Sequence, residues 1–297
     1  MRSSGWRLCT AGVGLLVWWC ATLWPQPGPA PVESVQAADV MASMAAGELV
    51  AKVVGNELGA HADGRFMYRD RRKTPEGEKT KELIETDAGV VARLIAIDGQ
   101  PLTPQQRSDE NGRLQNLQQH PELQRQKQRE QQQDDDRIKK MFAELPKAFR
   151  YQYEGTEADK SGETIRLSFA PDPRYQPPSR ETAVFKAMSG KFWVGLPDFR
   201  LARIQATLFR DVTFGWGLLG RLDKGGHFFV EQSKIAPQRW ETTSMNLQFT
   251  GKMLLFKSLN LCQVDYFTGF RPVPAGLTLA QGIEMLMKND SELAENR

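Results

Sequence analysis

The stretch FRLARIQATLFRDVTF, from Phe199 to Phe214, carries the pattern that decides the fold. Two kinds of side chain alternate along it, with Ala202, Ile204, Ala206 and Leu208 on one parity and Arg203, Gln205 and Thr207 on the other. A period of two indicates a β-strand that turns one face to a core and the other to solvent. The stretch therefore predicts a long strand in a sheet with one covered face.

Outward from this strand, further alternating or apolar segments recur about every ten residues, separated by turn signals rich in Gly, Pro and Asp. The predicted strands lie at residues 65–72, 78–87, 90–98, 149–154, 164–169, 181–188, 191–196, 227–236, 239–250 and 253–261. The segment 90–98 is apolar on both parities, which favours a central position. We predict an α+β fold with a large curled antiparallel sheet, a half-barrel of about eleven strands.

Three segments have helical spacing of apolar residues and can cover the concave face of such a sheet. They lie at 39–58, where Asp39 can cap the first turn, at 138–145, which Pro146 ends, and at 279–288, which Thr278 caps. The cover is needed because an open sheet cannot bury its apolar face alone.

Residues 103–146 are predicted to form a polar helical insertion, starting at a capping box of Thr103 and Gln106. Its middle, QRQKQREQQQDDDR at 124–137, has no apolar residue. Such a segment cannot bury a face, so it is either a solvated helix or disordered. The run 134–136 is compatible with cation binding, but a solvated charged stretch is the commoner meaning of three aspartates.

The N-terminus has the pattern of a secretory signal, with basic residues before a 14-residue apolar run from Ala11 to Trp24 and four prolines after it. We predict cleavage after Ala37, which makes residues 1–37 the signal peptide and 38–290 the folded domain. An uncleaved N-terminal anchor is the alternative, although a membrane span needs roughly 20 residues. The sequence thus predicts an exported, periplasmic protein.

Removal of residues 1–37 lowers the formal net charge from +3 to +2 and leaves Cys262 as the one cysteine. So mild a charge argues against nucleic acid as a partner. The three histidines lie in unrelated contexts, and the sequence has no His-x-x-x-His, Cys-x-x-Cys or Gly-x-Ser-x-Gly spacing. We therefore expect no metal site, no cofactor and no enzymatic activity.

The segment GWGLLG at 215–220 spells the G-x-G-x-x-G fingerprint of dinucleotide-binding loops. That fingerprint needs a helix after the loop to hold the pyrophosphate, whereas an aromatic and β-branched strand follows here. We predict a plain connecting loop. Because apolar tips flanked by cations also suit a cavity rim, a membrane or a partner, the candidate loop-contact residues are Trp216, Leu218, Leu219 and Arg221.

In the order of its elements the chain resembles the LolA-type lipoprotein carriers and their RseB (MucB)-like periplasmic relatives. The resemblance rests on RFMYRDRR (65–72) after a first amphipathic helix, on VARLIAIDGQPLTPQQ (91–106) running from strand into helix, and on FWVGLPDFRLARIQATLF (192–209) as hairpin strands. It covers about residues 39–288, and the polar insertion departs from the simple carrier.

The resemblance implies a non-catalytic binding protein for a lipid or for the acyl chain of a lipoprotein, held in a cavity between sheet and helices. Burial of an acyl chain gains about 0.8 kcal/mol per CH₂, so such a cavity needs no polar chemistry. The candidate lining consists of apolar strand positions: Phe66, Tyr68, Leu94, Val184, Trp193, Ile204, Leu208, Phe229, Leu247, Phe249 and Leu255.

Two other functions stay open. The chain can be an envelope-stress or structural interaction protein that acts through a protein partner, using the polar insertion or the Trp216 loop, with peripheral membrane contact. It can also be an exported hydrolase on the same sheet, which needs a carboxylate pair or a Ser–His cluster in one pocket.

Overall fold

The structure is a computed structural model that describes residues 36–60, 64–159, 162–214, 220–237, 239–253 and 257–295. The predicted signal peptide lies outside the described residues except for its last two positions. Leu255 and the loop residues Trp216, Leu218 and Leu219 also lie outside them.

The described chain contains one large sheet and a small set of helices. The strands are β1 (Arg65–Thr74), β2 (Gly77–Thr86), β3 (Gly89–Ile97), β4 (Gln100–Pro101), β5 (Phe149–Asp159), β6 (Gly162–Pro171), β7 (Met188–Gly195), β8 (Arg200–Leu208), β9 (Val212–Phe214), β10 (Gly220–Leu222), β11 (His227–Ala236), β12 (Arg239–Met253) and β13 (Lys257–Val273). The helices are α1 (Ala37–Ser43), α2 (Ala46–Gly59), α3 (Pro104–Gln119), α4 (Pro121–Ala148), the 3₁₀ helix η1 (Glu181–Ala187) and α5 (Leu279–Glu295).

The main path of the sheet runs β4-β3-β2-β1-β13-β12-β11-β8-β7-β6-β5, and β10 joins it beside β12 with β9 on its far side. All the pairings are antiparallel. β4 and β5 end the path with one neighbour each, so the sheet stays open. The prediction of a large antiparallel sheet of about eleven strands is confirmed, with the short β9 and β10 in addition.

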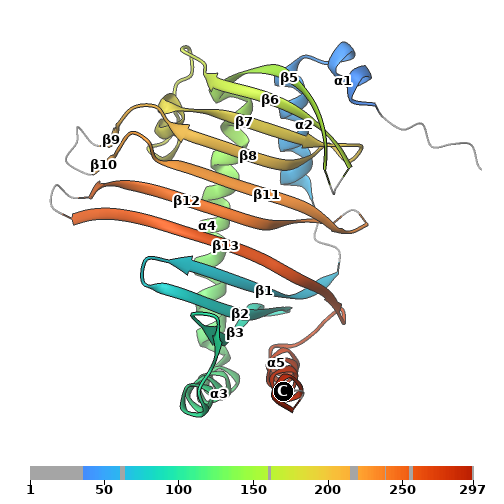
Figure 1. Ribbon diagram of the computed structural model, residues 1–297, viewed down its shortest axis with the longest axis vertical. Coiled ribbons are helices and arrows are strands. Elements are labelled where there is room, and N and C mark those ends of the chain that lie inside the picture. Colours follow the sequence, from blue (N-terminus) through green and yellow to red (C-terminus); the bar gives the residue numbers. More distant parts are fainter. Residues whose placement is uncertain are drawn as a thin grey trace, which may run out of the picture. The chain divides into compact units, whose positions relative to one another are not determined.

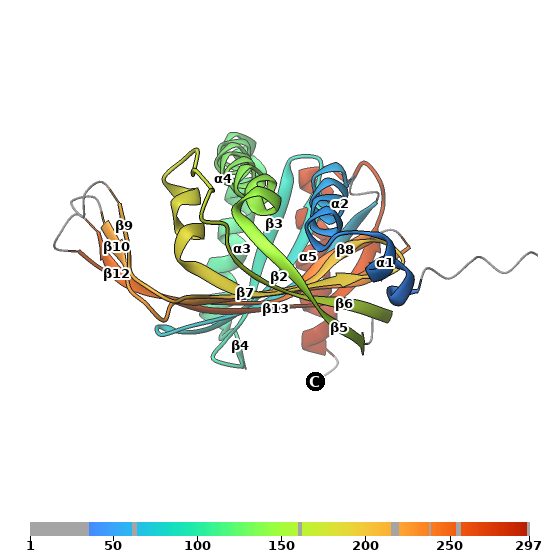
Figure 2. The same cartoon turned by 90° about the horizontal axis from the view of Figure 1, so that it is seen from above.

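Helices α2 and α4 lie side by side on one face of the sheet, which we call the inner face (Figures 1 and 2). Apolar side chains of α2 pack there against β6, β7 and β8. This main core includes Leu49, Val50, Val53 and Val54 from the helix and Ile165, Leu167, Phe192, Val194, Ile204 and Leu208 from the strands. At the end of α2, Glu57 accepts two hydrogen bonds from Arg200, at 2.7 and 2.9 Å, which fixes the helix on the sheet.

The first predicted helix is divided in two. The chain is extended at Met44, and the Glu48 side chain accepts a hydrogen bond from the Ala45 N–H (3.2 Å), which starts α2 afresh. Asp39 lies within the first turn of α1 and makes no capping bond, so the prediction of Asp39 as a cap is wrong.

One row of paired residues crosses six strands on the inner face. It consists of Ile204, Val230, Met245, Asp265, Arg72 and Lys79. Met67 lies an odd number of positions from Arg72 along β1, and β1 pairs with β2 without a register break. Side chains alternate along a strand, so Met67 points to the opposite face, which we call the outer face.

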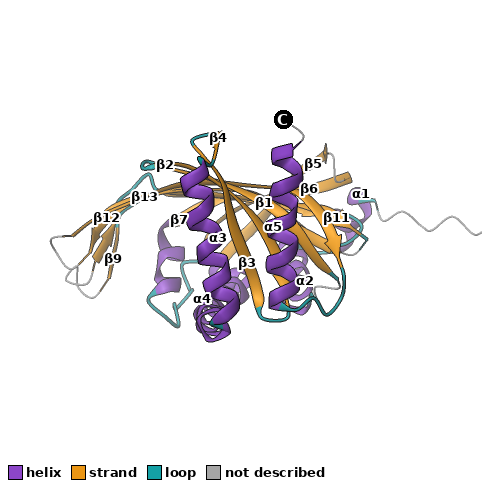
Figure 3. Cartoon of the chain, turned by 90° about the horizontal axis from the view of Figure 1, so that it is seen from below, coloured by secondary structure: helices purple, strands orange, loops and turns teal. Residues whose placement is uncertain are grey.

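Helix α5 packs on this outer face, beside α3 (Figure 3). A second core joins Met67, Ile84 and Val91 of the strands to Leu114 of α3 and to Leu279, Ile283 and Leu286 of α5. The prediction that the last helix covers the concave face with the others is therefore wrong. The reason is that Met67, Ile84 and Val91 of β1–β3 point outward and pack against the apolar side of α5.

The free edge of β3 is hydrogen-bonded by side chains of α3 and α4. Leu94 N–H donates to Glu110 Oε1 (2.8 Å), Arg113 Nη2 donates to the Ala92 carbonyl (2.6 Å), and Gln124 Nε2 donates to the carbonyls of Ala88 and Val90 (3.3 and 3.1 Å). Polar helix side chains thus take the place of a neighbouring strand. This corrects the prediction that 90–98 is a central strand.

Several predicted strand limits are also wrong. Residues 181–187 form η1 instead of a strand, because Ser179 and Thr182 hydrogen-bond to each other's backbone N–H and begin a helical turn. The stretch 199–214 is divided into β8 and β9. Gly251 continues β12 instead of turning, and it pairs with Leu222 of β10. A Cβ at this position would lie 2.1 Å from the Arg221 carbonyl oxygen, which explains the glycine.

The polar insertion consists of α3 and α4, and its middle is a solvated helix. The predicted capping box is present: Thr103 Oγ1 accepts from the Gln106 N–H (3.3 Å), and Gln106 Oε1 accepts from the Thr103 N–H (2.9 Å). α4 passes through Pro146 and ends at Ala148, later than predicted. So near the helix end, the missing proline N–H removes little of the hydrogen-bond ladder.

Replacement of Glu110 by Ala removes the acceptor of the Leu94 N–H and the partner of the Arg113 guanidinium. We expect Glu110→Ala to lower the free energy of unfolding by about 1–3 kcal/mol, the cost of a buried donor without a partner. Urea unfolding followed by circular dichroism measures the change. Asp109→Ala, at the exposed neighbouring position, should cost less than about 0.5 kcal/mol. Equal losses in the two variants would contradict the role of Glu110 at this edge.

Candidate functional site

The middle of α4 does not pack on the sheet. All side chains from 125 to 140 are exposed, although Gln124 and Leu145 at either end of this stretch are buried. Ile138 lies on the same stripe of the helix, about four turns after Gln124 and about two before Leu145, and is nevertheless 62 % exposed. The centre of α4 therefore crosses the inner face without burying its side chains on it.

The inner face under α4 changes polarity along the paired row. Ile204 is buried in the main core, Val230 and Met245 are half-buried, and Asp265, Arg72 and Lys79 follow. The inner face is therefore apolar next to the main core and charged toward β2.

The apolar side consists of five residues of β11 and β12, which we call the apolar strip: Phe228, Val230, Met245, Leu247 and Phe249. Phe228 pairs with Leu247, and Val230 pairs with Met245. Phe228, Val230 and Phe249 pack against the main core, yet all five side chains keep part of their surface exposed. The apolar strip thus extends the core into the space under α4.

The charged side consists of Asp70, Arg72, Lys79, Lys81 and Asp265, which we call the charged patch. Asp265 is fully buried and accepts hydrogen bonds from Arg72 Nε (2.6 Å) and Gln263 Nε2 (2.5 Å). Oδ1 of Asp70 is buried without a hydrogen-bond partner. Burial raises the pKa of Asp70, Arg72 offsets this in part, and the charge of Asp265 raises it further.

An aromatic group lies at the start of β1. Tyr68 stacks on Phe270 with 5.1 Å between ring centroids, and Arg239 lies 5.0 Å from the centre of the Phe66 ring. Arg239 also pairs with Glu85 (3.0 Å). Burial raises the pKa of the Tyr68 phenol well above its usual value, and the charge of Glu85 adds to this, so the hydroxyl is neutral at physiological pH.

The structure brings part of the predicted lining together. Val184, Ile204 and Leu208 are sealed in the main core, Leu247 and Phe249 belong to the apolar strip, and Phe66, Tyr68 and Leu94 lie on the inner face of β1 and β3. The sealed residues have no surface to offer a ligand unless the core opens.

Trp193 and Phe229 lie on the outer face, which corrects their expected place in the lining. Trp193 pairs with Arg203 and Phe229 with Gln205, each one position away from an inner-face residue. Trp193 packs with Trp240 and donates to Glu157 (3.1 Å). Sequence reasoning chose Phe229 and missed its neighbours Phe228 and Val230, because three successive apolar residues leave the parity of a strand undecided.

The described residues around the glycine fingerprint belong to strands. β9 and β10 pair with each other, and Gly220 opens β10 instead of a helix, so the context of a dinucleotide loop is missing there. Arg221 forms an ion pair with Asp223 (2.8 Å) and lies 3.8 Å from Asp211. The charge of Arg221 is therefore already neutralised by carboxylates next to β9 and β10.

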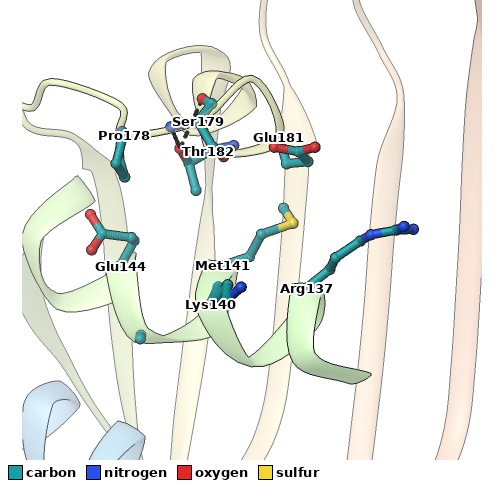
Figure 4. Close-up of a pocket in the computed structure, with 9 residues that line it drawn as sticks. Arg137, Lys140, Met141, Glu144, Pro178, Ser179, Glu181 and Thr182 are labelled. Carbon is teal, nitrogen blue, oxygen red and sulfur yellow. Dashed lines mark hydrogen bonds between the residues drawn. The ribbon is translucent and has the colours of Figure 1, made fainter. Parts of the chain in front are cut away.

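A separate pocket of about 540 Å³ opens between α4 and the start of η1 (Figure 4). Its lining includes Arg137, Lys140, Met141, Glu144, Pro178, Ser179, Glu181 and Thr182. The Ser179 and Thr182 hydroxyls hydrogen-bond each other (3.3 Å), and Glu144 is paired with Lys147 (3.1 Å). Because these polar groups already have partners, the pocket is a weaker candidate than the inner face.

No family model and no curated protein matches the sequence. Similar solved structures include a LolA superfamily protein from Nitrosomonas europaea, with 10 % identity and a TM-score of 0.26 over 78 % of this chain and 96 % of that one. A DUF1329 family protein from Desulfovibrio piger has 11 % identity and a TM-score of 0.28, covering 80 % and 97 %. An outer membrane lipoprotein-sorting protein domain from Vibrio parahaemolyticus has 8 % identity and a TM-score of 0.27, covering 81 % and 99 %.

Similarity at this level identifies neither the residues of a site nor a function for this protein. In the ranges that the structure describes, no helix has both the length and the apolar character to cross a membrane.

The space under α4 can be tested by comparing two apolar residues on one helix stripe. We expect Leu145→Ala to lower the free energy of unfolding by about 2–5 kcal/mol, because it leaves a cavity in the core. Ile138→Ala should change it by less than about 0.5 kcal/mol. Thermal and urea unfolding measure both. A loss at Ile138 close to that at Leu145 would show that the helix packs on the sheet there.

Substitution of Asp70 is expected to raise the free energy of unfolding by an amount that depends on pH. Its pKa is raised in the folded state, so the native protein binds this proton more tightly than the unfolded chain does, and ionised Asp70 destabilises the fold as the pH rises. We expect Asp70→Asn to be more stable than the wild type at pH 7 and to lose the advantage below the ordinary pKa of 3.8. Urea unfolding across this range measures the difference, with Asp135→Asn at an exposed position as the control. A wild type more stable than Asp70→Asn at pH 7 would refute this.

Proposed function

We propose that the chain is an exported, periplasmic binding protein for the acyl chain of a lipid or of an acylated protein, and that it is not an enzyme. The observation that carries the proposal is the half-exposed apolar strip beneath a helix that does not pack on it. A confined apolar surface reachable from solvent favours an acyl chain, which gains about 0.8 kcal/mol for each CH₂ it buries.

The charged patch limits where such a chain lies. An acyl chain next to Asp70 and Asp265 would remove water from carboxylates without giving them a partner, which is costly. The acyl chain therefore lies on β11 and β12, and the polar end of the ligand is directed toward β13 and β1. The surface available to the acyl chain is therefore smaller than the wholly apolar cavity expected from the sequence.

One observation favours a second candidate function, in which the chain is an RseB-like or structural interaction protein of the envelope. The middle of α4 is exposed all round and carries charges of both signs, such as Arg129, Glu130 and Asp136. A polar helix segment whose side chains stay exposed is a surface that a protein partner can cover. In this case the apolar strip has no ligand.

A matched pair of substitutions on neighbouring residues tests the first proposal. Leu247 belongs to the apolar strip, and Gln248 points to the outer face of the same strand. In a titration with a fluorescent long-chain fatty acid, we expect Leu247→Glu to weaken binding at least tenfold and Gln248→Glu to leave it within about twofold. Native mass spectrometry after mild extraction should show a lipid bound to the wild-type protein.

Two results would contradict the proposal. One is a lipid-free mass together with no titratable fatty-acid binding by the wild type, which would favour the interaction protein. The other is an equal loss of binding in Leu247→Glu and Gln248→Glu, which would place the acyl chain elsewhere.

A further inference from the structure

Lysines and an arginine of two strands lie together on the inner face beyond the apolar strip. Arg72 of β1 pairs directly with Lys79 of β2, and Lys81 is the next residue of β2 on the same face. Like charges directly opposite each other destabilise a sheet. The ion pair of Arg72 with Asp265 (2.6 Å) offsets this cost for Arg72, whereas Lys79 keeps the cation of Arg72 opposite it.

A third lysine approaches this group from α4. Gln124 binds the carbonyls of Ala88 and Val90, and Gln128 packs against Gly89, which together fix the helix over the β2–β3 turn. Lys127 lies on the same side of the helix. Partial desolvation lowers the pKa of Lys127, and the positive charges of Arg113 and Lys81 lower it further.

Asp70 lies directly opposite Lys81, and the charge of Lys81 lowers the pKa of Asp70, but no ion pair joins the two side chains. The other nearby carboxylates are bound by other side chains. Asp265 is bound by Arg72 and Gln263, and Glu110 is bound by Arg113 (2.7 Å). Among the residues that the structure describes, no carboxylate forms an ion pair with Lys79, Lys81 or Lys127. These three lysines, which we call the lysine group, therefore leave a positive site open to an anion.

The paired row places the lysine group in line with the apolar strip. From Lys79 to Val230 the row crosses four strand spacings, about 19 Å at 4.8 Å each. A molecule lying along the row meets cations at one end and apolar side chains at the other. This is the arrangement that an anionic amphiphile needs.

We propose that the lysine group, chiefly Lys81 and Lys127, binds the anionic head group of a single-chain amphiphile whose acyl chain lies on the apolar strip. The inference rests on the proposed function and adds the charge of the ligand to it. A phosphate or a carboxylate head group satisfies the same site, because lysine binds either as a point charge.

The test compares two lysolipids with the same acyl chain, lysophosphatidylglycerol, which is anionic, and lysophosphatidylcholine, which has no net charge. We expect the wild-type protein to bind the anionic lipid about tenfold more tightly at low salt, and the preference to shrink as salt is added. In Lys81→Gln/Lys127→Gln we expect the preference to vanish while lysophosphatidylcholine binds as before. Isothermal titration calorimetry measures all four affinities.

The control variant is Lys73→Gln/Lys139→Gln, which removes the same charge. Lys73 lies on the outer face of β1, and Lys139 is exposed on α4. The control should keep the wild-type preference; a loss as large as that in Lys81→Gln/Lys127→Gln would attribute the effect to net charge and overturn the inference.

Failure of the inference and failure of the proposed function give different results. Equal affinities of the wild type for the two lysolipids overturn the lysine group as a head-group site and leave acyl-chain binding in place. Binding of neither lysolipid contradicts the proposed function itself. Glycerol 3-phosphate separates the two sources of the anion: if it binds as tightly as lysophosphatidylglycerol, the site takes a free phosphate and the acyl chain has no part in it.

Discussion

A helix without apolar side chains cannot cover a sheet, and this constraint governs the arrangement of the protein. The segment 124–137 has no apolar residue, so the long helix α4 can be anchored only at its ends. At one end Gln124 binds the edge of β3, and at the other Leu145 enters the main core. The inner face between these two anchors has no apolar helix surface to pack on, and the apolar strip remains partly exposed.

Helices cover opposite faces of the sheet in its two halves. In β6–β8 the inner face is covered, by α2, whereas in β1–β3 the outer face is covered, by α5 and α3. Under α5 the buried Arg93 donates to the Leu286 carbonyl (3.1 Å), and the buried Glu82 pairs with Arg271 (3.0 Å). Because α5 occupies the outer face, the inner face of β1 and β2 is left to the charged patch. The exchange thus produces the change from apolar to charged along the paired row.

The sequence allowed the open antiparallel sheet to be predicted, because alternation in strands such as 199–208 is regular and turn signals separate them. It did not allow the cover of each face to be predicted. The spacing of Leu279, Ile283 and Leu286 indicates an apolar helix face, but nothing in that spacing says which face of the sheet it meets. The position of β3 was also mistaken, because side chains of α3 and α4, namely Glu110, Arg113 and Gln124, bind the edge where a neighbouring strand would pair.

The candidate site was only partly accessible to sequence reasoning, for a reason of the same kind. In HFFV at 227–230 both parities are apolar, so alternation could not separate Phe228 from Phe229. Residues Arg72, Lys79, Lys81 and Lys127 come from three elements, and only the register of the sheet and the path of α4 bring them together. The sequence alone therefore did not show that these charges lie together.

The charged patch lowers the stability of the fold, and this bears on what it is for. Asp70 keeps a buried oxygen without a partner, and Arg72 faces Lys79 across the strands. Each arrangement could be relieved by one neutral substitution, and stabilising changes of this kind are easy to reach in a protein of ordinary stability. Local conflicts that persist in an otherwise consistent structure are expected at functional sites. Here the two conflicts lie in one region, next to the apolar strip and under the part of α4 whose side chains are exposed. Their common position is explained if an anionic molecule enters that space, since it would neutralise the lysines and shield the like-charged pair.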